Sequence, residues 1–160
     1  MTDSNQTPSN EENFMAALPK WDDNNIETYD ANCHCGTVSY SVTLSPPLAE
    51  QKVVTCTCSI CSRNGYLLVY PFRKHVEIKS GEDVLKSYSF GRKMNLHKFC
   101  TNCGSSVFFD PRMPEQGIEV DLLGVNVRMF KGVGQNVDKL NLIPFDGYNK
   151  WPFIESEHLK

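Results

Sequence analysis

Short runs in which hydrophobic and polar side chains alternate make up most of the chain from Ile26 to about residue 123. In the clearest run, Thr37 to Leu44, every second residue is apolar, which is typical of a half-buried strand. Gly, Pro, Asp and Ser separate such runs from one another. The pattern predicts strands at residues 37–44, 52–55, 66–72, 75–79, 84–90, 94–99, 107–110 and 117–123.

Helices are expected to be few and short. No stretch of about twelve residues or more carries an apolar face at helical spacing. In the predicted domain, short helical turns are expected at residues 59–63 and 137–140. Many short strands with frequent turns favour a mainly β fold, whether a sandwich, a barrel or a folded sheet, over alternating strands and helices.

The chain is long enough for one domain with a single core. Residues 1–25 are polar and are predicted to be a flexible N-terminal arm, although Phe14 and Trp21 could instead pack it on the domain or on a partner subunit. Residues 26–150 are predicted to form the domain, in which the region after Leu140 reads as irregular. Residues 151–160 are expected to be a C-terminal tail.

Charge and hydropathy exclude two classes of partner. The chain has 16 basic and 19 acidic residues with no long run of either sign, which argues against a nucleic-acid partner held through its phosphates. No apolar run approaches the roughly 18 residues needed to cross a membrane, and the first ten residues are polar where a signal peptide would be apolar. We therefore expect a cytoplasmic protein without a membrane partner. Oligomerisation is left open.

The seven cysteines change the picture, because an odd number in a chain without an export signal favours reduced, metal-bound thiols over disulfides. Cys33 and Cys35 form a Cys-x-Cys pair, and Cys100 and Cys103 form the Cys-x-x-Cys-Gly pattern of a zinc knuckle. Four thiolates complete a tetrahedral structural zinc site. A redox dithiol at Cys100 and Cys103 is disfavoured because no βαβ pattern surrounds it. His34 is interpreted as a structural histidine.

The remaining thiols, Cys56, Cys58 and Cys61, lie within six residues and are one ligand short of a closed site. A zinc ion held by three thiolates carries a net charge of about −1, so it is suited to binding a substrate thiol rather than to generating hydroxide. Such a site predicts the addition of a thiol to a small electrophilic carbon, or the reverse cleavage. Two alternatives stay open: a second structural site completed by His75 or His97, and a regulatory thiol cluster without metal.

Three motifs carry a family resemblance. Cys-His-Cys-Gly at 33–36, Cys-x-Cys-Ser-x-Cys at 56–61 with Gly65 after it, and Phe-Cys-x-x-Cys-Gly-Ser at 99–105 resemble the glutathione-dependent formaldehyde-activating enzyme family, also called the centromere-protein-V-like domain family. The resemblance covers about residues 28–148, with softer support from 124–128 and from Asp146-Gly147. It implies a β-tent of packed antiparallel sheets and two Zn²⁺ per chain. The structural zinc falls on Cys33, Cys35, Cys100 and Cys103, and the catalytic zinc on Cys56, Cys58 and Cys61.

The family's activity is that of an S-(hydroxymethyl)glutathione synthase, a carbon–sulfur lyase in the reverse direction. The resemblance therefore implies a small thiol substrate, glutathione among the candidates, and formaldehyde. Alternatives are the same fold acting on another small molecule, and a non-enzymatic zinc-stabilised binding module. The residues single out no acid–base group and no site for the carboxylates of glutathione. Candidate cations are Arg63, Lys74, Arg92 and Lys93, and candidate acid–base residues are His75, His97, Tyr66 and Asn64.

Overall fold

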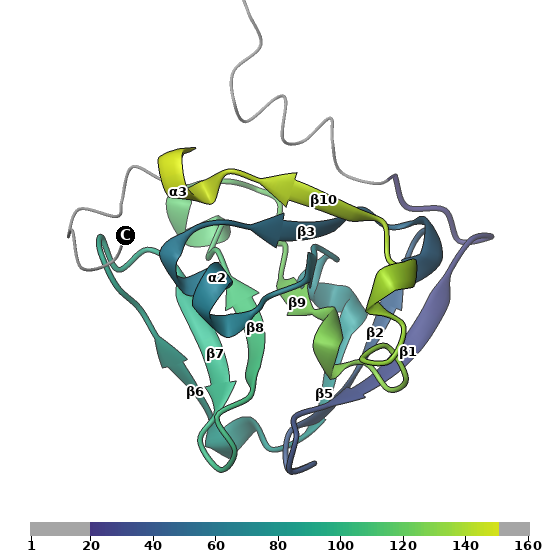
Figure 1. Cartoon of the computed structure of the whole chain (residues 1–160), viewed down its shortest axis with the longest axis horizontal. Coiled ribbons are helices and arrows are strands. Elements are labelled where there is room, and N and C mark those ends of the chain that lie inside the picture. Colours follow the sequence, from purple (N-terminus) through teal and green to yellow (C-terminus); the bar gives the residue numbers. More distant parts are fainter. Residues whose placement is uncertain (1–19, 151–160) are drawn as a thin grey trace, which may run out of the picture.

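Two β-sheets form the framework of residues 20–150, the part of the chain that the computed structural model describes (Figure 1). The smaller sheet is antiparallel in the order β1-β2-β5, with β1 at Glu27–Asn32, β2 at Ser39–Leu44 and β5 at Val76–Ser80. The larger sheet has the order β10-β3-β4-β9-β8-β7-β6. Its strands are β3 Val53–Cys56, β4 Leu68–Val69, β6 Leu85–Tyr88, β7 Leu96–Cys100, β8 Ser106–Asp110, β9 Gly124–Asn126 and β10 Leu142–Phe145.

The prediction of a mainly β chain with few helices is confirmed. Within residues 20–150 the α-helices are α2, Ser59–Asn64, and α3, Gly147–Lys150, each shorter than two turns. Figure 1 shows β6, β7 and β8 on one side of the molecule, β1, β2 and β5 on the other, and β3 and β10 across the top of the view. The helix α2 lies below β3 on the inner side, so the loop that carries the three clustered thiols is placed over the larger sheet.

The core lies between the two sheets and follows the alternation in the sequence. On β2, Tyr40, Val42 and Leu44 are buried, and from the other sheet Phe108 of β8 meets them. The rings of Tyr40 and Phe108 are 4.7 Å apart and tilted by 60°, a favourable geometry for an aromatic pair. The apolar residues at every second position of 37–44 are therefore the ones that β2 turns toward this core.

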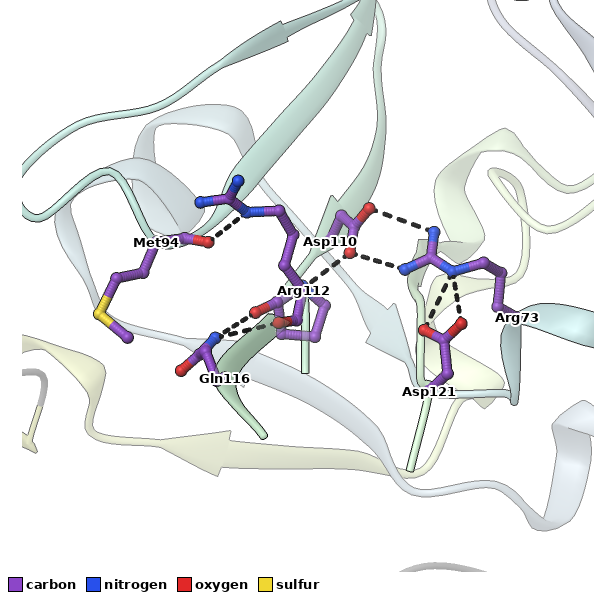
Figure 2. A network of polar contacts seen from close by, with 7 residues as sticks. Arg73, Met94, Asp110, Arg112, Gln116 and Asp121 are labelled. Carbon is purple, nitrogen blue, oxygen red and sulfur yellow. Dashed lines mark hydrogen bonds and ion pairs between the residues drawn. The ribbon is translucent and has the colours of Figure 1, made fainter. Parts of the chain in front are cut away.

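A network of charged side chains fixes the far end of β8 (Figure 2). The guanidinium of Arg73 donates to both carboxylate oxygens of Asp110, at 2.7 and 3.1 Å, and its Nε donates to Asp121 at 3.0 Å. Asp110 is buried, so Arg73 supplies the charge that makes this burial tolerable. Arg112, just beyond β8, donates from Nε to the Met94 carbonyl at 2.7 Å and thereby holds the turn before β7.

Two predicted segments differ from the structure. The strand predicted at 117–123 is wrong, since Leu122 makes only an isolated bridge to Phe72 and its neighbour Asp121 turns its carboxylate to Arg73. The run predicted at 66–72 is a strand only at Leu68–Val69. In both segments, contacts made by one or two residues take the place of the continuous strand pairing that the sequence pattern predicts.

The region after Leu140, interpreted as irregular, contains strand β10 and helix α3. β10 pairs parallel with β3, which is the one departure among the described strands from the expected antiparallel sheets. Pro144 in the centre of β10 masks its strand character in the sequence, and the structure tolerates it because β10 is the edge strand of its sheet.

The remaining predictions concern the two ends of the chain. Residues 1–19, and with them Phe14, lie outside the described residues, as does the tail predicted at 151–160. Trp21 stacks on the ring of His75 with a centroid distance of 3.7 Å, and the backbone N–H of Asp22 donates to the Ser45 hydroxyl. Among residues 20–150, no helix has the length and apolar character needed to cross a membrane.

Candidate metal centres

The first thiol group joins two turns that are far apart in the sequence. Cys33 and Cys35 lie in the turn between β1 and β2, while Cys100 ends β7 and Cys103 lies in the turn that leads to β8. The sulfurs of all four lie within 4.8 Å of one another. The Sγ atoms of Cys33 and Cys35 are 3.5 Å apart, and those of Cys35 and Cys100 are 3.8 Å apart.

The local sequence explains how both turns aim their sulfurs. Gly36 and Gly104 follow the second cysteine of each pair with φ of 80° and 74°, a left-handed conformation that glycine adopts without strain. The N–H of Gly36 donates to the Cys33 carbonyl, and the N–H of Gly104 donates to the Cys100 carbonyl. Each Cys pair is therefore followed by a left-handed glycine whose N–H donates back to the first cysteine of the pair.

The spacing of these four sulfurs fits a tetrahedral ion. Metal–sulfur bonds of about 2.3 Å give a tetrahedron with edges of about 3.8 Å, close to the observed distances. Burial raises the pKa of Cys33 to about 11, whereas the hydrogen bond with the Ser105 hydroxyl lowers the pKa of Cys103 to about 5. Four thiolates this close repel one another strongly unless a cation lies between them. The group could therefore hold a metal ion.

The second thiol group is built by one short loop. Cys56 is the last residue of β3, Cys58 is the N-cap of α2, and Cys61 lies within that helix. Their sulfurs also lie within 4.8 Å of one another, and the backbone N–H of Cys58 donates to the Cys56 sulfur at 3.4 Å. The helix ends at Gly65, whose φ of 60° and ψ of 38° are the left-handed values of a C-cap glycine. The predicted helical turn at 59–63 is confirmed.

This second group has three ligand atoms and no fourth. Within residues 20–150, no histidine nitrogen or carboxylate oxygen joins the three sulfurs, so neither His75 nor His97 completes a closed site. The hydrogen bond with Cys56 is the largest cause that raises the pKa of both Cys58 and Cys61. A cation placed among the three would reverse this effect. This group too could hold a metal ion, with one side free of protein ligands.

Aromatic side chains form the wall beside the three thiols. Tyr66 and Leu68 are buried with Cys58 and Cys61, and Tyr70, Phe90 and Phe109 pack against them. His97 of β7 is buried in the same wall, where its ring stacks on that of Phe90 at 5.7 Å. Burial lowers the pKa of His97 to about 4, so its ring is neutral at neutral pH.

One polar pair lies within this wall. The hydroxyl oxygen of Tyr66 is 3.5 Å from Nδ1 of His97, and both residues are buried. Burial is the largest cause that raises the pKa of Tyr66, and hydrogen bonds with the side chains of Asn64 and Ser106 oppose it. Of the candidate acid–base residues, Tyr66, His97 and Asn64 thus come together here, whereas His75 stacks on Trp21 elsewhere.

The candidate cations are scattered. Arg63 donates to the Ser59 carbonyl on its own helix, and Lys93 donates to the Ser89 carbonyl. Lys74 lies 5.9 Å from the centre of the Phe72 ring. Arg92 is exposed and lies two residues after Phe90, which packs against the three-thiol group. His34 is exposed and belongs to neither thiol group.

Sequence reasoning missed the contact between the C-terminal part of the domain and the three-thiol loop. Thr57, between Cys56 and Cys58, hydrogen-bonds to the last residue of β10 and to two residues that follow it. The only signal in the sequence was Asp146-Gly147, a typical turn dipeptide.

Comparison with known proteins identifies the family of this chain. A search of curated protein sequences found no match. Among solved structures, a crystal structure of a Rhodobacter sphaeroides protein is similar to the chain, with a TM-score of 0.58 and 27% identity over 71% of this chain and 99% of that one. The model of the family described as glutathione-dependent formaldehyde-activating enzyme matches residues 28–131, which include all seven cysteines. The chain therefore belongs to the glutathione-dependent formaldehyde-activating enzyme family.

Proposed function

We propose that this protein is a zinc-dependent carbon–sulfur lyase that joins a small thiol, glutathione in the first instance, to formaldehyde and also catalyses the reverse reaction. The observation that carries this proposal is the group of three sulfurs that finds no fourth protein ligand among residues 20–150, beside the buried pair of Tyr66 and His97. Cys33, Cys35, Cys100 and Cys103 would hold a structural zinc ion. Cys56, Cys58 and Cys61 would hold the catalytic zinc ion.

The donor set decides which chemistry is available. All seven ligands are thiolates, which favour zinc over the harder cations that prefer oxygen. A zinc ion on Cys56, Cys58 and Cys61 would bind the substrate thiol and favour loss of its proton at neutral pH. Because the three thiolates already outweigh the ion's charge, the substrate sulfur keeps its nucleophilic character.

In the proposed reaction, Tyr66 is the proton donor and His97 orients its hydroxyl. The thiolate sulfur forms a bond to the carbonyl carbon of formaldehyde, and the electron pair of the C=O bond moves to the oxygen. Tyr66 donates its hydroxyl proton to that oxygen, which gives the S-hydroxymethyl product. The neutral tautomer of His97 with Nδ1 protonated would donate to the Tyr66 oxygen and leave the Tyr66 hydrogen directed at the substrate oxygen. The proton that the substrate thiol lost to solvent balances the one that Tyr66 recovers.

The proposed activity can be tested by exchange spectroscopy. We expect the zinc-loaded protein to accelerate the exchange between free formaldehyde, glutathione and S-(hydroxymethyl)glutathione, measured by NMR against the same mixture without protein. Boiled protein controls for free zinc. A protein that contains two zinc ions but does not accelerate the exchange would contradict glutathione and formaldehyde as substrates.

Replacement of Tyr66 by Phe is expected to lower the exchange rate by about 10²-fold or more, because the loss of a positioned proton donor typically costs this much. The zinc content should stay at the level of the unchanged protein, since no ligand is touched. Tyr88→Phe is the matched control, because Tyr88 is exposed and its ring stacks on Phe90 of the same wall. Equal rates for both variants would remove Tyr66 from the mechanism.

A further inference from the structure

The residue between the first two clustered thiols is held by a segment almost ninety positions away in the sequence. The backbone N–H of Thr57 donates to the Phe145 carbonyl at 3.0 Å, and its hydroxyl lies 3.3 Å from Oδ1 of Asp146. The backbone N–H of Tyr148 in turn donates to the Thr57 hydroxyl at 3.2 Å. We call residues 142–150, which comprise β10 and α3, the C-terminal clamp.

The clamp approaches the thiols by strand pairing. β10 runs parallel to β3 with Leu142 opposite Val53 and Phe145 opposite Cys56, so the ladder reaches the first thiol ligand. The hydrogen bonds of Thr57 extend it one residue further. Figure 1 shows β10 beside β3, and α3 at the end of β3 where the chain turns into α2.

Asp146 makes the clamp rigid where it contacts Thr57. Its Oδ1 accepts the backbone N–H of Asn149 at 3.2 Å, and its Oδ2 accepts the side-chain amide of Asn149 at 2.8 Å. The carbonyl of Asp146 accepts the N–H of Lys150. The carboxylate is therefore fixed by its own turn and presents a defined acceptor to the Thr57 hydroxyl.

The two thiol groups differ in how their loops are supported. In the four-thiol group, glycine turns and the Ser105 hydroxyl lie within the motifs themselves. The three-thiol loop has no fourth ligand to restrain the ion, so the positions of its sulfurs depend more on contacts outside the ligand set. The clamp supplies such contacts, and it lies beyond residue 131, where the family match ends.

We propose that the C-terminal clamp positions the three-thiol loop through Thr57 and thereby sets the metal affinity of Cys56, Cys58 and Cys61. Thr57 is a positioning residue, since it acts through the sulfurs on either side of it. The proposal rests on the proposed function only in requiring that these three thiols hold a zinc ion. It adds that residues outside the matched family region tune this ion separately from the structural one.

The test measures zinc release from the full-length, zinc-loaded protein by a competing chelator. Alkylation of the freed thiols, mapped by peptide mass, identifies which group has lost its ion. For Thr57→Val, we expect the zinc affinity of Cys56, Cys58 and Cys61 to fall by about tenfold, at the lower end of the range for contacts around a metal site. The affinity of the four-thiol group should be unchanged. Thr57→Ser keeps the hydroxyl and should behave like the unchanged protein.

Thr55→Val is the matched control, because the Thr55 hydroxyl contacts the Ile143 carbonyl in the same pair of strands but lies before the thiols. Wild-type affinity in Thr57→Val, or equal weakening of both zinc ions, would overturn the role of the clamp and leave the proposed function standing. An unchanged protein that binds only one zinc ion would overturn both. Lower turnover in Thr57→Val without any change in zinc release would also contradict the proposal.

Discussion

Cys103→Ser is expected to leave the chain largely unfolded at neutral pH. Structural zinc on four thiolates contributes roughly 10–16 kcal/mol of apparent free energy, and domains of this size have a total free energy of unfolding of about 5–15 kcal/mol. Removing one ligand loses a large part of the free energy that zinc binding contributes. Cys103 is half-buried, so the exchange of sulfur for oxygen by itself costs little packing.

The topology explains why this loss is global. Cys33 and Cys35 adjoin β2 of the smaller sheet, whereas Cys100 and Cys103 flank the end of β7 in the larger one. The Sγ atoms of Cys35 and Cys100 come together across 65 positions of sequence. A metal ion held by these sulfurs would therefore link the two sheets.

Circular dichroism and thermal unfolding measure this effect, together with metal analysis. Asn102→Ala is the control in the same turn, because Asn102 is exposed and is not a thiol ligand. Its side-chain amide donates only to the Thr37 hydroxyl among the contacts described for it. A folded, cooperative Cys103→Ser protein with one zinc ion fewer would show that the four-thiol group is dispensable for the fold.

Cys58→Ser is expected to have the opposite profile, with turnover reduced to the rate in solution and the fold retained. The substitution removes one of three sulfurs from a group that has no spare ligand. Cys58 is the N-cap of α2, and serine is among the best residues at an N-cap, so the helix keeps its start. Formaldehyde exchange, zinc content and unfolding temperature are measured on the same preparation.

Ser62→Ala tests whether a change in α2 alone has this effect, since Ser62 donates to the Cys58 carbonyl and has no sulfur. It should keep its second zinc ion and most of its turnover. If Cys58→Ser loses as much stability as Cys103→Ser, both groups are structural and the three thiols do not form the proposed open site.

The candidate site shows where prediction from the sequence reached its limit. The cysteine pairs, the turn glycines and the helix after Cys58 depend on residues at most a few positions apart, so spacing and turn chemistry alone indicated them. The Tyr66 and His97 pair brings together residues 31 positions apart. No periodicity in the sequence marks such a contact, because it depends on how β7 packs beside the loop after α2.

The sequence by itself determined the mainly β class and the division of seven thiols into groups of four and three, since both follow from local patterns and ligand counting. Only the tertiary structure decided that β10 lies parallel to β3, that Thr57 meets Asp146 across 89 positions, and that the three thiols face an aromatic wall. These features come from the packing of distant strands, where the burial of whole faces outweighs the preferences of any single segment. The local motifs therefore predicted the thiol ligands, and the fold supplied their surroundings.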